Sequence, residues 1–215
     1  MNADQFRMLL ESGDIKTLRE ALTTDPTLAN QTVKWHLNQD NESDPLHYVS
    51  DCVFNSLLDE DLAVGVAEAL LEYGADINGS HHRESPLIAA ASLGVEKVAA
   101  LLVYSGANLE LTSIFGSRAL HWAAAIGLPQ TVEILIQAGA EIEAKCSEFG
   151  ATPLYWAVHA VGPHGLKNKR NPIEAAKILV AAGANANTMN KHGVSALNYA
   201  REIKSLKLCE LLSQD

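Results

Sequence analysis

The clearest structural signal in the chain is the stretch SPLIAAASLGVEKVAALLVYSGAN, residues 85–108. Its Ser-Pro start is typical of a helix N-terminus, because the serine hydroxyl can accept a hydrogen bond from a free amide and the proline φ is already helical. The alanines that follow permit a neighbouring helix to approach closely. Gly106 is typical of a left-handed helix end. The stretch therefore predicts two short helices joined by a turn and closed by a glycine.

Five copies of this pattern can be recognised along the chain. Each copy has a leucine near its start, at Leu46, Leu87, Leu120, Leu154 and Leu197, with spacings of 41, 33, 34 and 43 residues. The first four copies also have a Gly-Ala pair near their end, beginning at Gly74, Gly106, Gly139 and Gly183. Self-similarity at a period of about 20–50 residues is typical of solenoids built from stacked units.

A period near 33 residues with these anchors resembles the ankyrin repeat family over about residues 39–212. Thr152-Pro153-Leu154 matches the opening motif of that family, and Gly74-Ala75-Asp76 matches its closing motif. The resemblance implies an all-α fold, an ankyrin-like helical solenoid of about six helix-turn-helix repeats with short β-hairpin turns. One unit departs from the pattern, because Arg118-Ala119 replaces the Thr-Pro pair and removes the usual helix cap.

We expect a single ankyrin repeat domain over residues 1–215. Its expected units are an N-terminal cap repeat (1–38), repeat 2 with an insertion (39–79), repeat 3 (80–112), repeat 4 (113–146), repeat 5 with an insertion (147–189) and a C-terminal cap repeat (190–215). In the first cap we expect helices near Ala3–Glu11 and Ile15–Leu22, and in the last cap a helix over Leu206–Leu212.

Two units are longer than the others, by 9 and 10 residues between the motif leucine and the closing glycine. The additional residues fall between the two helices of each unit, as Cys52–Asp61 and Val161–Asn171. Gly and Pro residues in the second insertion predict an irregular loop, with a helix starting at Pro172. Long surface loops cost little stability, so the insertions are either tolerated length variation or partner contacts.

Aromatic residues gather at one repeated position, two residues after the motif leucines. This position holds Tyr48, Ala89, Trp122, Trp156 and Tyr199, in a chain with only 6% aromatics. The resemblance places it on the first helix of each unit, on the concave surface of the stack. We expect its four aromatics to contact a partner, because such rings are typical of interface hot spots. The alternative is that they pack between neighbouring helices as core.

A second row of candidates lies at the expected hairpin tips. Asn41, His82, Phe115, Phe149 and His192 stand just before the tip glycines or their equivalents. Exposed phenylalanines at two neighbouring tips are unusual for a soluble surface, which favours binding over packing. The remaining candidate contacts are Ile126 and His159 at the ends of first helices, and Lys167, Lys169 and Arg170 in the second insertion.

Composition excludes several classes of protein. The chain has 47% hydrophobic residues and a net charge of −10, which does not fit a disordered chain, and no apolar run approaches the length of a membrane helix. Residues 1–80 hold 15 acidic and 4 basic side chains, net −11, and residues 81–215 hold 11 and 12, net +1. This balance argues against nucleic acid and favours a cationic partner, although the charge could also serve solubility alone.

Motifs of enzymes and metal sites are missing from the sequence. It contains no CxxC, HExxH, GxSxG or Walker motif, and His159 and His164 are separated by Gly and Pro, so we expect no catalytic residue, metal or cofactor. In the family, His47 and His121 would hold structural positions that bridge backbone groups between repeats. Three widely spaced cysteines and a polar N-terminus favour the cytoplasm.

We therefore expect a monomeric, non-catalytic protein–protein interaction scaffold whose partner is another protein with a basic surface, and neither nucleic acid nor membrane. Two alternatives remain open. One is an inhibitor or immunity-type binder of a basic toxin or enzyme, since the small acidic chain looks like stand-alone ankyrin proteins of bacterial type. The other is a small-ligand or catalytic protein that uses the loop of repeat 5.

Overall fold

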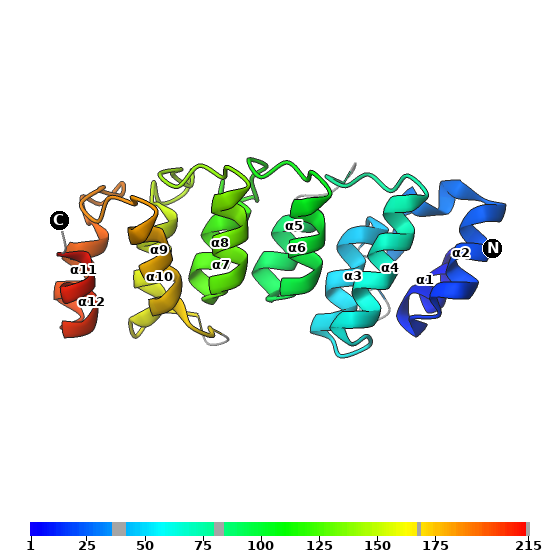
Figure 1. Ribbon diagram of the computed structural model, residues 1–215, viewed down its shortest axis with the longest axis horizontal. Coiled ribbons are helices and arrows are strands. Elements are labelled where there is room, and N and C mark those ends of the chain that lie inside the picture. The colour runs from blue at the N-terminus through cyan, green and yellow to red at the C-terminus, as the bar shows by residue number, and fades with distance from the viewer. Residues whose placement is uncertain (36–41, 80–83, 167–168, 214–215) are drawn as a thin grey trace. The chain divides into compact units, whose positions relative to one another are not determined.

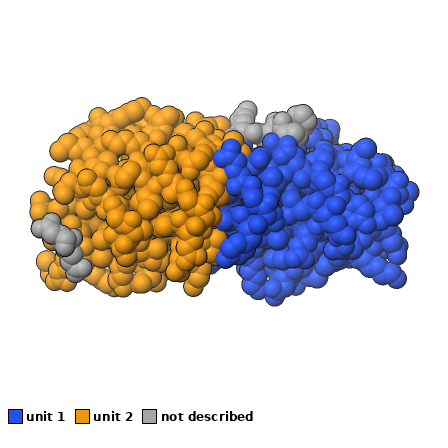
Figure 2. Space-filling model, turned by 45° about the horizontal axis from the view of Figure 1, so that its top comes forward, with its two compact units in different colours: residues 1–108 blue, residues 109–215 orange. Residues whose placement is uncertain are grey.

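A computed structural model describes residues 1–35, 42–79, 84–166 and 169–213 of the protein (Figure 1). The chain forms two compact units, residues 1–108 and residues 109–215 (Figure 2). Three residues selected from the sequence, Asn41, His82 and Lys167, lie outside the described residues. The described part is mostly helical, with no helix long and apolar enough to cross a membrane.

The first unit contains three helix pairs. Its elements are α1 (Ala3–Ser12), α2 (Ile15–Thr24), the 3-10 helix η1 (Pro26–Asn30), strands β1 (Val33–Lys34) and β2 (Glu42–Ser43), α3 (Pro45–Phe54), α4 (Glu60–Glu72), α5 (Pro86–Leu93) and α6 (Glu96–Tyr104). The first helices of the pairs pack in the row α1–α3–α5, and α4 packs against both α2 and α6 in a second row. Leucine and alanine side chains, such as Leu46 and Ala90, are buried between the rows.

The second unit repeats this arrangement. Its elements are α7 (Ala119–Ile126), α8 (Pro129–Gln137), α9 (Pro153–Val161), α10 (Pro172–Ala181), α11 (Ala196–Glu202) and α12 (Leu206–Leu212). Helix α9 packs between α7 and α11, and α10 packs between α8 and α12. The sequence prediction of an all-α stack of helix pairs is confirmed, including the helix that starts at Pro172.

Local hydrogen bonds explain where most helices begin and end. The Ser85 and Thr152 hydroxyls each accept a hydrogen bond from the third helical amide, at Ile88 and Tyr155, at 3.3 Å. The glycines of the Gly-Ala pairs have positive φ values, for example 88° at Gly106. These are the caps and the left-handed ends that the sequence pattern predicts.

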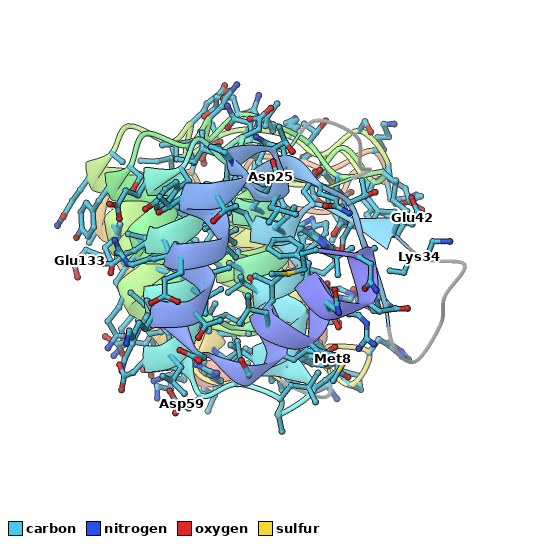
Figure 3. All side chains as sticks on the ribbon, turned by 90° about the vertical axis from the view of Figure 1, so that its right-hand side faces the viewer. Met8, Asp25, Lys34, Glu42, Asp59 and Glu133 are labelled. Atoms are coloured by element: carbon cyan, nitrogen blue, oxygen red, sulfur yellow. The ribbon has the colours of Figure 1, made fainter. Side chains whose placement is uncertain are left out.

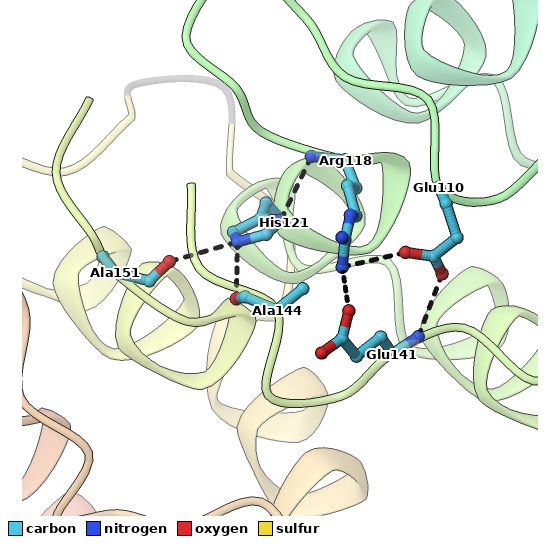
Figure 4. Close-up of polar contacts among 6 residues, drawn as sticks. All are labelled: Glu110, Arg118, His121, Glu141, Ala144 and Ala151. Atoms are coloured by element: carbon cyan, nitrogen blue, oxygen red, sulfur yellow. Dashed lines mark hydrogen bonds and ion pairs between the residues drawn. The ribbon is translucent and has the colours of Figure 1, made fainter. Parts of the chain in front are cut away.

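Helix α7 begins without the usual Thr-Pro pair, and other contacts hold its first turn. The Nδ1 atom of His121 accepts a hydrogen bond from the Arg118 amide at 3.1 Å (Figure 4). The Arg118 guanidinium is held between the carboxylates of Glu110 and Glu141, at 2.8 and 2.6 Å. The first turn of this helix is therefore fixed by a side chain inside the helix and by two flanking acidic residues.

Among the described residues, regular β structure is restricted to one two-stranded antiparallel sheet in the first unit. Val33 lies opposite Ser43, and Lys34 lies opposite Glu42, with 3.6 Å between the Lys34 ammonium and the Glu42 carboxylate (Figure 3). The tips in the second unit are hydrogen-bonded turns, such as the one closed by the Ser113 amide and the Ser117 carbonyl at 2.8 Å. These turns are too short to form strands.

The two insertions take different forms. In the first, α3 extends to Phe54 and α4 starts early at Glu60, so helix extension takes up much of the added length. The Glu60 carboxylate accepts a hydrogen bond from the Lys97 amide at 2.7 Å, and Asp61 pairs with the Lys97 ammonium. Because these acidic side chains cap and pair with α6, they stabilise the unit as well as adding charge.

The second insertion is an irregular loop fastened to the end of α7. The Arg170 amide donates to the Ile126 carbonyl at 2.6 Å, and the Asn171 amide donates to the Gly127 carbonyl at 3.0 Å. The Lys169 ammonium donates to the Ala160 carbonyl at the end of α9. The loop thus satisfies backbone carbonyls that would otherwise be left without partners at two helix ends.

Candidate functional site

The second unit contains an open cavity of about 490 Å³ beside α9. Six residues selected from the sequence line it, namely Phe115, Trp122, Phe149, Trp156, His159 and His192. These residues come from two helices and three turn tips, so the repeat brings distant parts of the chain to one place. The cavity is the candidate functional site.

Two phenylalanines at neighbouring tips form part of its rim. The side chains of Phe115 and Phe149 are 37% and 42% exposed. Their backbone is held in place by the next tip: the Phe115 carbonyl accepts from the Glu148 amide at 3.1 Å, and the Phe149 carbonyl accepts from the Lys191 amide at 2.9 Å. Hydrogen bonds therefore fix the backbone at both tips, while the phenylalanine rings themselves stay partly exposed.

A glycine makes this close approach of the tips possible. Gly116 has φ of 65°, and a Cβ atom at this position would lie 2.6 Å from the backbone nitrogen of Ser147. The Ser147 hydroxyl also donates to the Phe115 carbonyl at 3.2 Å. No larger residue at position 116 could keep these tips together.

Two tryptophans make up a large part of the aromatic lining. The rings of Trp122 on α7 and Trp156 on α9 meet edge to face, with centroids 5.2 Å apart and an interplanar angle of 79°. Phe115 continues this group, 6.5 Å from Trp122. Such contacts stabilise the rings in a fixed geometry while leaving part of their surface accessible. The indole nitrogen of Trp122 has no hydrogen-bond partner within the described structure.

A second ring group lies further along α9. His159 lies 5.9 Å from Tyr155 in a stacked arrangement and 5.0 Å from Tyr199. Burial lowers the pKa of His159, and the nearby His164 lowers it further. His159 is therefore neutral at pH 7, and its ring can accept as well as donate hydrogen bonds.

Charged groups lie at opposite ends of the cavity. Glu148, in the tip before α9, provides the one carboxylate among the lining residues that the structure describes. At the other end, the Lys169 ammonium is bound to the carbonyl of Ala160, which itself lines the cavity. An ammonium also lies near the tips, because Lys191 donates to the carbonyl of Ser147, the residue before Glu148.

Other residues selected from the sequence are placed elsewhere. Tyr48 belongs to the first unit and is buried, and its hydroxyl donates to Glu11 at 2.6 Å. Ile126 is buried where the second insertion joins α7, and its carbonyl accepts from Arg170. Tyr199 is also buried, with its ring 5.0 Å from that of His159. For these three side chains, packing accounts for the position in the structure.

Several lining residues were not selected from the sequence as partner contacts. They include Glu148, Tyr155, His164, Leu166 and Asn190. Tyr155 occupies the same repeat position as His47 and His121, so the repeat pattern suggested a structural role for it. Glu148 and Asn190 stand close in the sequence to the selected tip residues Phe149 and His192. This closeness is the signal that could have identified them as lining residues.

The histidines at the repeated motif position differ from one another. The Nε2 atom of His121 lies 3.1 Å from the carbonyls of both Ala144 and Ala151, which is the bridging role expected from the family (Figure 4). The Nδ1 atom of His47 lies 3.4 Å from the Asp51 carboxylate. Within the described chain, no group of three or more His, Cys, Asp or Glu side chains is arranged to hold a metal ion.

Comparison with known proteins agrees with this architecture. Residues 120–215 match the family described as ankyrin repeats (3 copies). These residues are ankyrin repeats. The stacked helix pairs that carry them form an ankyrin-type helical solenoid, as predicted from the sequence. Ankyrin repeats are in general protein-binding scaffolds and are generally non-catalytic.

The curated relatives include the B-cell lymphoma 3 protein homolog of Mus musculus, which is 33% identical over 93 residues. The match covers 43% of this chain and 18% of that protein. The chain thus corresponds to less than a fifth of the mouse protein. Since this relative is a mouse protein, the comparison gives no support to the expectation of a bacterial type.

Proposed function

We propose that this chain is a non-catalytic scaffold that binds another protein through the cavity beside α9 and its rim at Phe115 and Phe149. The observation that carries the proposal is the pair of exposed phenylalanines, held by the backbone of the next tip over an aromatic lining. Exposed rings of this kind are costly in water and gain free energy when a partner covers them.

The rigidity of the site supports the same function. Trp122 and Trp156 are fixed against each other, and the tips are joined by hydrogen bonds before any partner arrives. A surface that is already ordered loses little conformational entropy on binding, so more of the contact energy appears as affinity. Aromatic residues at the centre of a well-packed surface are typical hot spots.

We further propose that the partner has a basic surface and meets a single copy of the chain in the cytoplasm. The net charge of −10 supports a cationic partner, and three cysteines without a disulfide fit a reducing compartment. An inhibitor of a basic toxin or enzyme would be a special case of this function. An inhibitor differs from a general scaffold in that its partner loses activity when bound.

The small-ligand alternative is supported by one observation, the presence of both His159 and His164 in the lining of a cavity of about 490 Å³. A thermal-shift screen with metabolites and metal ions tests it. A reproducible rise in melting temperature that is lost in His159→Ala would favour this alternative. If no compound raises the melting temperature, the small-ligand alternative is wrong and the protein-binding proposal remains.

The scaffold proposal is tested with the double variant Phe115→Ala/Phe149→Ala. The unaltered chain is used as bait in an extract of its native cells, and the partner identified by mass spectrometry is then purified for calorimetry. We expect the double variant to bind this partner at least about 30-fold more weakly, because two hot-spot rings are removed. Its melting temperature should change little, because both rings are substantially exposed.

Tyr104→Ala is the matched control, since Tyr104 is a 75% exposed aromatic residue of the first unit. This variant should bind the partner like the unaltered chain. Unchanged affinity in the double variant, together with a lower melting temperature, would mean that the phenylalanines serve packing and that the proposal is wrong.

A further inference from the structure

The first insertion exposes three apolar side chains at one edge of the first unit. Phe54, at the end of α3, is 55% exposed, and Leu57 and Leu62 are each 38% exposed. Leu58 is buried instead, and a Cβ atom on Gly13 would lie 3.0 Å from Leu58 and 3.2 Å from Leu62. We call Phe54, Leu57 and Leu62 the apolar ledge. It is a separate surface from the cavity beside α9, which belongs to the other unit.

The backbone of the insertion fixes which side chains are exposed. The Cys52 carbonyl accepts hydrogen bonds from the amides of Leu57 and Leu58, at 2.8 and 3.3 Å. Ser56 has φ of 60°, a left-handed conformation that is unfavourable for residues other than glycine. An ordered turn that keeps an unfavourable residue points to a use for the side chains that it exposes. Large apolar groups exposed close together are typical of interaction sites.

Acidic side chains flank the apolar ledge. The last three residues of the insertion, 59–61, are all acidic, and the insertion contains no basic residue. The Lys97 ammonium pairs with Asp61 and offsets one of these charges. At the start of α2, the charges of Asp14 and Lys16 offset each other. The ledge therefore keeps an excess of negative charge, in a unit whose residues 1–108 hold 17 acidic and 6 basic side chains.

This excess discriminates between the possible occupants of the ledge. A second copy of the chain would offer either the same acidic unit or residues 109–215, which are close to neutral with 9 acidic and 10 basic side chains. A membrane surface rich in anionic lipid would repel the acidic unit. A protein segment that carries lysine or arginine beside apolar side chains complements both the charge and the apolar surface.

We propose that the apolar ledge is a second docking surface, which binds a basic segment of a partner protein. Apolar side chains of the segment cover Phe54, Leu57 and Leu62, and its lysine or arginine side chains lie beside Asp59. This surface goes beyond the proposed function, because it lies in the other unit and does not involve the cavity. The first insertion is then a partner contact as well as additional length.

The test begins with a random peptide library displayed on phage, selected in parallel on the full chain and on its double variant Phe54→Ser/Leu57→Ser. We expect one class of peptides to be enriched on the unaltered chain alone, and this class to combine apolar residues with a net positive charge. Synthetic peptides of this class should bind the double variant at least about tenfold more weakly. The melting temperature should change little, because both side chains are already exposed.

A matched control and a spectroscopic readout locate the binding site. Leu206→Ser, at a leucine of the second unit that is 79% exposed, should bind the selected peptides like the unaltered chain. In NMR spectra, the peptides should shift the amide signals of residues 54–62. The indole signals of Trp122 and Trp156, which line the cavity, should not move.

Asp59→Asn tests the charge at the ledge while keeping the helix cap, because asparagine can also accept the hydrogen bond from the Leu62 amide. We expect this variant to bind the selected peptides about threefold or more weakly, with a smaller dependence on salt. Asp25→Asn is the matched control. Asp25 accepts from the Thr27 amide in the same way and lies at the opposite edge of the first unit (Figure 3). Equal losses in the two variants would overturn the placement of the basic group beside Asp59.

The other occupants have measurements of their own. Vesicles of phosphatidylserine and phosphatidylcholine should not bind the chain, and sedimentation velocity should show a monomer. Vesicle binding or a dimer that is lost in Phe54→Ser/Leu57→Ser would assign the ledge to a membrane or to a second copy and overturn the proposal. So would the absence of a peptide class that depends on the ledge, or such a class without net positive charge. The variant Phe115→Ala/Phe149→Ala leaves the ledge intact, so each of the two proposals can fail without the other.

Discussion

His121 is a buried imidazole whose two nitrogens both serve the backbone of the second unit. Its Nδ1 atom accepts from the Arg118 amide, and its Nε2–H group donates toward the carbonyls of Ala144 and Ala151, at 3.1 Å in each case. This pattern requires the neutral ring, with the proton on Nε2. Burial lowers the pKa of His121 to about 4, against the opposing effect of the two carbonyls.

This pKa predicts how stability depends on pH. Above about pH 6.5 the ring is neutral in both the folded and the unfolded chain, so it adds no pH dependence. As the pH falls from about 6.5 to 4, the unfolded chain binds a proton first, and the free energy of unfolding should drop by on the order of 3 kcal/mol. Urea unfolding at a series of pH values measures this change.

The variant His121→Gln isolates the contribution of this ring. It should be less stable at pH 7 and should lose less stability on acidification than the unaltered chain. Gln130→Ala, at an exposed position of α8 without an ionisable group, is the control and should keep the original slope. Parallel pH profiles for the unaltered chain and His121→Gln would contradict the assignment.

Helix α7 and the second insertion depend on each other through Gly127. This glycine has φ of 77°, and a Cβ atom on it would lie 2.3 Å from the Pro172 nitrogen and 2.4 Å from the Asn171 carbonyl carbon. The insertion loop passes so close because its amides pair with the last carbonyls of α7. The additional length of this repeat therefore closes a helix end, whatever further role the loop has.

We expect Gly127→Ala to lower the free energy of unfolding by more than about 3 kcal/mol, since backbone strain and a backbone clash add together. Gly193→Ala is the matched control: Gly193 has φ of 71° but nothing within 4 Å of the added Cβ. That variant should cost about 1–2 kcal/mol, from backbone strain alone. Denaturant unfolding of both variants measures the difference. Equal losses of the free energy of unfolding would show that the second insertion can move away from residue 127 at no cost.

Charge is distributed unevenly over the whole molecule. Residues 1–80 hold 15 acidic and 4 basic side chains, whereas residues 81–215 hold 11 and 12. Some of the acidic groups are engaged locally, as Glu72 is with Arg19 and Asp61 is with Lys97. Others, such as Glu20 and Glu68, are exposed. The resulting negative field acts over about a Debye length, roughly 10 Å at 0.1 M salt.

Partner association should therefore slow as salt is added. Between about 50 and 500 mM NaCl we expect the association rate constant to fall about tenfold or more, because screening removes the attraction of a basic partner. The dissociation rate constant should change much less, since it reflects the aromatic contacts at the cavity. Surface plasmon resonance with the purified partner measures both constants. An association rate that does not depend on salt would argue against a basic partner.

Much of the fold was predictable because its signals are local. The Ser85 and Thr152 caps reach only three residues along the chain, and the glycine helix ends depend on the φ of one residue. The row of first helices follows from the same leucine and alanine spacing. The exposure of Phe115 and Phe149 was also predicted, since each stands at the tip of a turn and is followed by a glycine.

By itself, the sequence determined that the chain folds as stacked helix pairs, where most of the helices start and stop, and that aromatic residues repeat at one helical position. Only the tertiary structure decided which of these aromatics are accessible. Tyr48 and Tyr199 are buried by their neighbours, while Trp122 and Trp156 line a cavity. It also decided that Ile126 lies against the second insertion, through a bond to Arg170, 44 residues away in the chain. The physical reason is that helix ends are set by contacts a few residues apart, whereas burial and cavities depend on side chains that meet only after the repeats have stacked.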